Sequence, residues 1–407
     1  MIIRPAERTL GVSEYYFSRK NPEIARLSEE RVAKGLDPVV NLGIGAPDGM
    51  PPAAAIERLR ETALLKDSHK YQNYRGLPEL RKAFADWYAR YYGVSLDPVT
   101  DIQPLAGSKE GIMLVSLAFA NPGDRILVPD PGYPTYTSAS MMAGAVCIPY
   151  PLLPENGWYP DFEALEKQDL CGVKIMWLNY PNMPTGAPAT TELYERAVAF
   201  GLKHDILIVN DNPYSFVLTE KPLSILAVPR AKECCIELNS LSKAHNMSGW
   251  RIGMVGGDKD YVAQILKVKS QMDSGMFRSV QLAAVEALSQ GPEWFKALNA
   301  EYRIRREDGS TIFIKREKDC TFAHGKAHRR QYLIDTGIRW NDALTVHEDS
   351  YFNILCQSLS ENVKYCPYSF YLWKWRDESV CRHDSKYILK TFNNLIDSNE
   401  ALVAEFE

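Results

Sequence analysis

The sequence predicts an α/β fold in which helices cover both faces of a mostly parallel β-sheet. Between about Leu105 and Gly257, short β-branched and apolar runs alternate with longer helical patterns. Strands that alternate with helices in this way indicate successive βαβ units. The chain has 407 residues, which suits one large and one small domain, and it contains no repeats or low-complexity linkers.

Composition and charge argue against several classes of function. Apolar residues make up 45% of the chain and charged residues 24%, as in an ordinary soluble enzyme. The net charge is −4 without long charged blocks, so we expect no nucleic-acid partner and no polybasic membrane role. The longest apolar stretch, around Gly111–Ala120, is too short to span a bilayer and reads as a buried helix.

The cysteines and the N-terminus indicate a reduced, cytoplasmic protein. None of the eight cysteines shows CxxC spacing, and Cys234 and Cys235 are adjacent. A disulfide framework or a metal site is therefore not expected. The N-terminus carries Arg4 and Arg8 without an apolar core segment, so it does not read as a signal peptide.

The elements follow one another in chain order. Two helices precede the sheet at Asn21–Gly35 and Pro78–Tyr92. The predicted strands are Arg125–Val128, Val146–Tyr150, Lys174–Leu178, Ile206–Val209, Cys234–Leu238 and Ile252–Val255. The helices that accompany or follow them are Thr191–His204, Ser279–Ser289 and Trp294–Arg306. Ligands of such sheets bind beyond the carboxyl ends of the strands, so we expect the functional residues directly after these runs.

Lys243 follows the fifth of these strands in the run Ser240-Leu241-Ser242-Lys243, with Arg251 eight residues later. An amine at the end of an apolar stretch can form a Schiff base with an aldehyde cofactor. The hydroxyls of Ser240 and Ser242 and the guanidinium of Arg251 can hold a phosphate. A solvated lysine at a strand end is the alternative interpretation, which the run alone would favour.

Two further segments carry candidate polar groups. Gly107-Ser108-Lys109-Glu110-Gly111 follows an expected turn at Pro104 and opens an apolar helix, where backbone N–H groups suit a phosphate. Asp211 follows the strand Ile206–Val209, and a partly desolvated carboxylate there suits a protonated ring nitrogen. The alternatives are a plain turn for the first segment and a helix N-cap for Asp211.

The order and spacing of these motifs resemble class I/II aminotransferases, the fold-type I pyridoxal-phosphate enzymes related to aspartate aminotransferase and LL-diaminopimelate aminotransferase. The resemblance extends from about Glu14 to Arg306. It implies a large domain over residues 46–290 with a mostly parallel seven-stranded sheet between helices. Residues 1–45 and 291–407 would form the N-terminal arm and a smaller α+β domain.

The resemblance also assigns roles to single residues. Lys243 would bind pyridoxal 5′-phosphate, Asp211 would pair with its ring nitrogen, and Tyr214 would contact its phenolic oxygen. Tyr133, in Pro131-Gly132-Tyr133-Pro134, would stack on the ring. The residues that would anchor the phosphate are Ser108, Lys109, Ser240, Ser242 and Arg251.

Three assignments concern the edges of the site. In the family, an asparagine contacts the phenolic oxygen of the cofactor. Met183 occupies the position of that asparagine here, and Asn182 lies one position before it. The contact is therefore either made by Asn182 or lost. Tyr71 resembles the tyrosine that reaches the phosphate of the neighbouring subunit, which implies a homodimer with a shared active site. Gly45 resembles the glycine segment that passes over the substrate carboxylate, where a missing side chain allows close approach.

The expected reaction is transfer of an amino group from an amino acid to a 2-oxo acid. A pyridoxal-phosphate C–S lyase, another pyridoxal-phosphate enzyme, and an impaired pyridoxal-phosphate-binding protein are the alternatives, because a fold does not fix its reaction.

The pattern is lost after about Arg306. The resemblance implies an arginine there that grips the substrate carboxylate, and Arg376 and Arg382 are the nearest candidates, although neither has matching neighbours. Either the small domain is divergent, or the reading frame of the source gene changes near residues 306–320.

Overall fold

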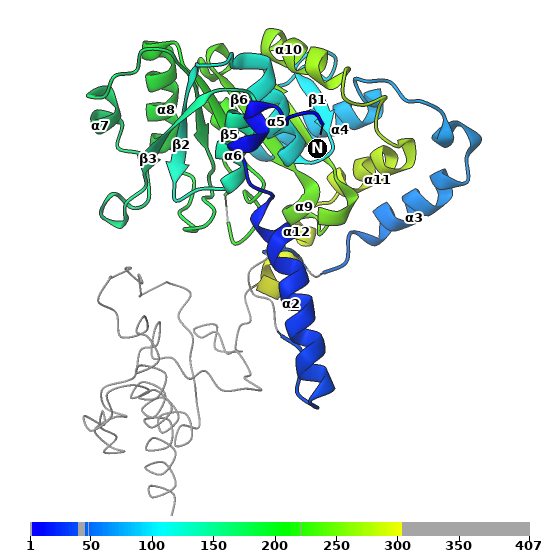
Figure 1. Cartoon of the computed structure of the whole chain (residues 1–407). Coiled ribbons are helices and arrows are strands. Elements are labelled where there is room, and N and C mark those ends of the chain that lie inside the picture. Colours follow the sequence, from blue (N-terminus) through cyan, green and yellow to red (C-terminus); the bar gives the residue numbers. More distant parts are fainter. Residues whose placement is uncertain (1, 40–44, 48, 220, 303–407) are drawn as a thin grey trace, which may run out of the picture. The chain divides into compact units, whose positions relative to one another are not determined.

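A computed structural model of the protein describes residues 2–39, 45–47, 49–219 and 221–302 (Figure 1). The chain divides into two compact units, Met1–Asn299 and Ala300–Glu407. Residues 303–407, and with them Arg376, Arg382 and most of the predicted small domain, lie outside the described residues.

A seven-stranded sheet forms the centre of the first unit, in the order β1-β7-β6-β5-β4-β2-β3. The strands are β1 (Ile102–Leu105), β2 (Arg125–Asp130), β3 (Val146–Pro151), β4 (Val173–Leu178), β5 (Leu207–Asp211), β6 (Cys235–Ser240) and β7 (Gly253–Gly257). All neighbouring pairs from β3 to β6 are parallel, whereas β7 is antiparallel to both β6 and β1. The predicted mostly parallel α/β sheet is therefore confirmed.

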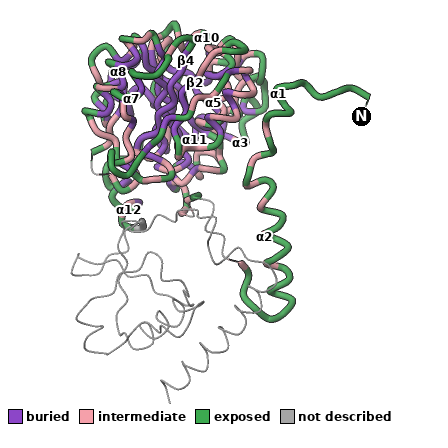
Figure 2. Tube along the Cα trace, turned by 60° about the vertical axis from the view of Figure 1, so that its left-hand side comes forward, coloured by how far each residue is buried: buried purple, intermediate pink, exposed green. Residues whose placement is uncertain are grey.

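Helices pack on both faces of this sheet (Figure 1). One apolar cluster joins the strands to α5 (Ser108–Phe119), α6 (Pro134–Met142) and α10 (Lys259–Lys269). The other joins them to α4 (Pro78–Tyr92), α8 (Thr191–His204) and α11 (Arg278–Leu288). In β4, Ile175 and Trp177 belong to the first cluster, and Met176 and Leu178 to the second. Alternate side chains of a central strand thus fill two separate cores, and Figure 2 shows the buried residues concentrated there.

The remaining helices connect or flank these layers. They are α1 (Glu7–Leu10), α2 (Tyr16–Ala33), α3 (Ala53–Ala63), α7 (Phe162–Glu166), α9 (Leu241–Ala244) and α12 (Pro292–Tyr302). Helix α3 packs on α11. Helix α2 begins five residues before the predicted start at Asn21 and contains Pro22, and none of its residues is buried.

Local signals explain why α4 and α8 have the predicted bounds. Pro78 occupies the first turn of α4, where its missing N–H costs nothing, and Gly93 ends the helix in a left-handed conformation. The Thr190 hydroxyl caps α8 by accepting a hydrogen bond from the Leu193 N–H at 3.1 Å.

The expected turn at Pro104 is wrong, because Pro104 lies within β1. This strand has four residues and forms the edge of the sheet, paired with β7 alone. An edge strand tolerates a proline since one of its sides has no ladder partner. So short a run with a central proline gave no strand signal in the sequence.

Candidate active site

The sheet topology brings the predicted functional residues to one edge. Because β1, β2, β4, β5 and β6 run in the same direction, the loops that follow them meet at their shared carboxyl ends. The strand ends, these loops and the first turns of the helices that follow carry most of the predicted site residues, namely Ser108, Lys109, Tyr133, Asn182, Asp211, Tyr214, Ser240, Ser242 and Lys243.

Lys243 lies in the one-turn helix α9 directly after β6. Its half-buried amine donates a hydrogen bond to the carbonyl of Gly45 and lies 5.7 Å from the centroid of the Tyr214 ring. Burial lowers the pKa of this amine, and the charge of Arg251 lowers it further. A larger fraction of the amine is therefore neutral, and nucleophilic, at a given pH.

A cup of donors lies beside this lysine. The Ser240 hydroxyl donates to the Ser242 hydroxyl at 2.8 Å, and the Arg251 guanidinium donates to the carbonyls of Ser248 at 2.9 Å and Ala106 at 3.3 Å. At Gly107, where φ is +82°, a Cβ atom would overlap the Arg251 guanidinium. Only glycine allows this loop to lie against the arginine at the start of α5.

Asp211 ends β5 and is buried. Its Oδ2 accepts a hydrogen bond from the Tyr136 hydroxyl at 2.9 Å. Burial raises the pKa of this carboxyl to about 6, while the hydroxyls of Tyr136 and Ser108 act in the opposite direction. The second oxygen, Oδ1, is buried and has no regular hydrogen bond within the described part of the chain. No described helix begins at Asp211, so it is not an N-cap.

Asn182 is buried, and its amide is used within its own loop. The Nδ2 group donates to the Asn179 carbonyl at 3.1 Å, and Oδ1 accepts from the Thr185 hydroxyl at 2.7 Å. Asn179 braces the same loop, since its Nδ2 donates to the Asp211 carbonyl at 2.7 Å and its Oδ1 accepts from the Met183 N–H at 2.8 Å. The contact of Asn182 with a cofactor stays a prediction.

An aromatic cluster that includes Tyr133 contains two residues that the sequence reasoning missed. The Tyr133 ring packs edge-to-face against Tyr136 at a centroid distance of 5.6 Å and against Tyr15 at 6.4 Å. The hydroxyls of Tyr15 and Tyr133 are 3.4 Å apart, and the Lys109 ammonium lies 3.8 Å from the centroid of the Tyr15 ring. Tyr15 and Tyr136 carry no motif, and only tertiary packing brings them here.

Tyr71 stands apart from this cluster. Its side chain is 91% exposed.

Among the described residues, no group of His, Cys, Asp and Glu side chains has the geometry to hold a metal ion. None of the described helices has the length and apolar character needed to cross a membrane.

Comparison with known proteins identifies the family. Residues 37–314 match the family described as aminotransferase class I and II. The chain belongs to this family. The predicted fold-type I architecture and amino-group-transfer activity are thereby confirmed, and the family uses pyridoxal phosphate.

Curated relatives and solved structures agree. LL-diaminopimelate aminotransferase of Aquifex aeolicus is 44% identical over 287 residues, covering 70% of this aminotransferase and 74% of the relative. The enzyme of that name from Gloeobacter violaceus is 42% identical over 307 residues, covering 75% and 77%. Among solved structures, substrate-bound BacF from Bacillus subtilis matches with a TM-score of 0.68 and 37% identity, over 74% of this chain and 75% of that one. Thermus thermophilus aspartate aminotransferase with maleate matches with a TM-score of 0.67 and 28% identity, over 74% and 76%.

Proposed function

We propose that this aminotransferase binds pyridoxal 5′-phosphate through Lys243 and moves the amino group of a small amino acid to a 2-oxo acid. The donor we propose is LL-diaminopimelate, because the relatives with 40–44% identity carry that name. Residues 303–407, which contain Arg376 and Arg382, enter this proposal only as the predicted source of a carboxylate-binding arginine.

The residues present fit the cofactor. The observation that carries the proposal is the buried oxygen Oδ1 of Asp211, which has no regular hydrogen bond within the described residues. A protonated pyridine nitrogen supplies both the donor and the positive charge that such an oxygen requires. A half-buried amine with a lowered pKa, Lys243, and the cup around Arg251 lie at the same edge of the sheet.

Each side chain then has a defined task. When bound, pyridoxal phosphate supplies an aldehyde and a ring that takes up electrons from the substrate Cα. The Lys243 amine would bind the aldehyde group, and the same amine, once free and neutral, would accept the proton of the substrate Cα and return it. Asp211 keeps the ring nitrogen protonated, and Tyr214 and Asn182 are assigned to the phenolic oxygen.

The remaining tasks are anchoring and orientation. Tyr133 would hold the face of the ring, and the backbone at Gly45 would leave room for the substrate carboxylate. The phosphate is bound by the α5 N-terminus and by the hydroxyls and cations of Ser108, Lys109, Ser240, Ser242 and Arg251.

We further propose a homodimer with shared active sites. Leu64, Tyr71 and Met272 are exposed by 84%, 91% and 53%. The segments around them touch, because the Phe277 ring lies 6.0 Å from that of His69. Exposed apolar side chains that lie together on one surface suit a contact with another protein. A second copy would cover them, and Tyr71 would reach the phosphate in that copy.

A reduced, cytoplasmic setting completes the proposal. The cysteines of the described residues, Cys147, Cys171, Cys234 and Cys235, are free thiols, as such a compartment requires.

A spectroscopic assay tests the proposed function. The purified protein is incubated with pyridoxal phosphate, and the absorption band at ~420 nm is followed while LL-diaminopimelate, aspartate or alanine is added. We expect the amino donor to convert the band to one at ~330 nm, and 2-oxoglutarate to restore it. Release of pyruvate and a thiol from a sulfur amino acid, without transfer, would instead indicate a lyase.

A further inference from the structure

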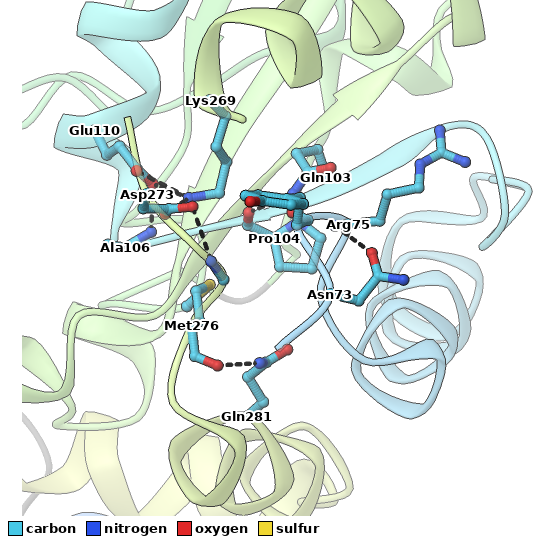
Figure 3. Close-up of polar contacts among 12 residues, drawn as sticks. Asn73, Arg75, Gln103, Pro104, Ala106, Glu110, Lys269, Asp273, Met276 and Gln281 are labelled. Atoms are coloured by element: carbon cyan, nitrogen blue, oxygen red, sulfur yellow. Dashed lines mark hydrogen bonds and ion pairs between the residues drawn. The ribbon is translucent and has the colours of Figure 1, made fainter. Parts of the chain in front are cut away.

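Lys269 is a buried lysine outside the residues used so far. It ends α10, and its side chain is only 1% exposed. Its ammonium lies 2.9 Å and 3.2 Å from the two carboxylate oxygens of Glu110 and 2.5 Å from Oδ2 of Asp273 (Figure 3). Because desolvation offsets much of the attraction within such a cluster, a buried ion pair is a poor device for stability alone. The function of the cluster therefore lies in the groups that its two carboxylates hold.

On one side, the cluster fixes the start of the phosphate cup. Glu110 occupies the first turn of α5, and its Oε2 accepts a hydrogen bond from the Ala106 N–H at 2.6 Å. The carbonyl of Ala106 in turn accepts from the Arg251 guanidinium. The ammonium of Lys269 thus holds the carboxylate that fixes the backbone between β1 and α5.

On the other side, the cluster fixes the turn between α10 and α11. The Oδ1 atom of Asp273 accepts from the Gly275 N–H at 3.2 Å. Gly275 lies so close to the carbonyl of Gln72 that a Cβ atom would be 2.5 Å from its oxygen. Gln72 follows Tyr71 directly, so the turn supports the segment that carries this exposed tyrosine.

The next contacts extend the same support (Figure 3). The Met276 carbonyl accepts from the Gln281 amide at 2.6 Å, and the other end of that amide accepts from the Leu77 N–H at 2.8 Å. The turn after α10 is therefore joined at two places to residues 72–77.

We propose that Lys269 is a positioning residue for the cofactor phosphate. One ammonium holds two elements in place: the Ala106–Ser108 backbone of its own cup, through Glu110, and the support of Tyr71, through Asp273. The proposal rests on the function proposed above, because it requires a phosphate-bearing cofactor in the cup. It predicts that loss of Lys269 weakens binding of the phosphate specifically.

The test compares two forms of the cofactor in the full chain. Pyridoxal phosphate and pyridoxal, which lacks the phosphate, are titrated into Lys269→Met, and dissociation constants are read from the visible band. Lys232→Met is the matched control, because Lys232 also pairs with a carboxylate, Asp101, at 2.9 Å but does not contact Glu110 or the Ala106 N–H. Melting temperatures are recorded for every variant.

We expect Lys269→Met to weaken the binding of pyridoxal phosphate about 10-fold, the lower end of the losses seen when residues that orient metal ligands are replaced. Pyridoxal binding should stay at the wild-type value, and the control should bind both compounds normally. Equal losses for both compounds, or no loss for pyridoxal phosphate, would overturn the proposal. If Lys269→Met does not fold, Glu110→Gln is tested with the same two compounds. This variant should also weaken the binding of pyridoxal phosphate but not of pyridoxal, with a smaller loss of affinity. A wild-type protein that binds neither compound would refute the proposed function instead.

Discussion

The Tyr136 hydroxyl donates a hydrogen bond to the Asp211 carboxylate at 2.9 Å, and both groups are buried. The bond joins the first half of α6 to the end of β5, and the two residues are 75 positions apart in the chain. The hydrogen bond stabilises the ionised carboxylate and so lowers the pKa of Asp211. Burial acts in the opposite direction and is the larger effect, so the pKa is still raised to about 6. The protonation state of Asp211 therefore depends on a residue without any sequence motif.

Tyr136→Phe should move the pH dependence of cofactor binding to higher pH. The ionised form of Asp211 is the one that pairs with a protonated ring nitrogen, so affinity should fall as pH drops through the pKa of about 6 in the free protein. Removing the Tyr136 hydroxyl raises that pKa further, so the affinity for the cofactor begins to fall at a higher pH. Dissociation constants of pyridoxal phosphate measured from pH 5 to 9 check this. Tyr150→Phe is the control, because its hydroxyl donates to the Trp177 carbonyl instead. Superimposable pH profiles for both variants would refute the role of Tyr136.

Asp211→Asn should stabilise the cofactor-free protein at neutral pH while it impairs function. The pKa of the Asp211 carboxyl is 3.8 in the unfolded chain and about 6 in the folded protein. The charged carboxylate therefore begins to destabilise the folded state as the pH rises above 3.8, and the full destabilisation is reached above about pH 6. The shift corresponds to roughly 2–3 kcal/mol. Urea unfolding at pH 8 should show a gain of that order, and at pH 3 no gain. The visible absorption band should persist, but transfer should fall more than about 100-fold because the ring nitrogen loses its partner. Full activity would exclude Asp211 from the site.

Gly107→Ala should damage the phosphate cup rather than the fold. Both Gly107 and Gly93 have positive φ, so alanine costs about 1 kcal/mol of stability at either position. Only at Gly107 does the new Cβ atom meet the Arg251 guanidinium, whereas at Gly93 it meets nothing within 4 Å. We expect similar losses in melting temperature from the two variants, but weaker binding of pyridoxal phosphate only for Gly107→Ala. Equal affinities would show that Arg251 moves aside without consequence.

Tyr71 should act in the active site of the other subunit. We expect Lys243→Ala and Tyr71→Ala each to be nearly inactive alone. In a hybrid dimer of the two, one site would combine an intact Lys243 with an intact Tyr71. A random mixture of subunits should then regain about a quarter of wild-type activity. No recovery, although hybrid dimers are detected by mass spectrometry, would place Tyr71 in its own site or outside both.

The sequence predicted most of the sheet, because its strands depend on local patterns. Six of the seven strands follow apolar runs, and α4 and α8 have explicit start and stop signals. The missed strand, β1, has four residues with a proline, and it forms only because β7 lies beside it.

Three residues near the candidate site, Tyr136, Tyr15 and Lys269, were not predictable from local sequence patterns. Tyr136 reaches Asp211, and Tyr15 reaches Lys109 and Tyr133, through tertiary packing alone. Lys269 carries no motif, and its burial depends on α10 packing against α5.

The ending of the chain poses a separate question that the coding DNA can answer. The family match ends at residue 314, close to the loss of pattern near Arg306. If the reading frame changes near residues 306–320, another frame should encode an aminotransferase-like ending with a carboxylate-binding arginine. If no other frame does so, the divergent small domain is the remaining explanation.

The central claim, that Lys243 is the lysine that binds the cofactor, has a direct test. The protein is incubated with pyridoxal phosphate, reduced with borohydride so that the cofactor stays on its amine, digested, and mapped by mass spectrometry. We predict that the cofactor mass is found on the peptide that contains Lys243, and that Lys243→Ala shows neither this peptide nor the visible absorption band. Labelling of another lysine in the wild-type protein, or an unchanged band in Lys243→Ala, would contradict the account.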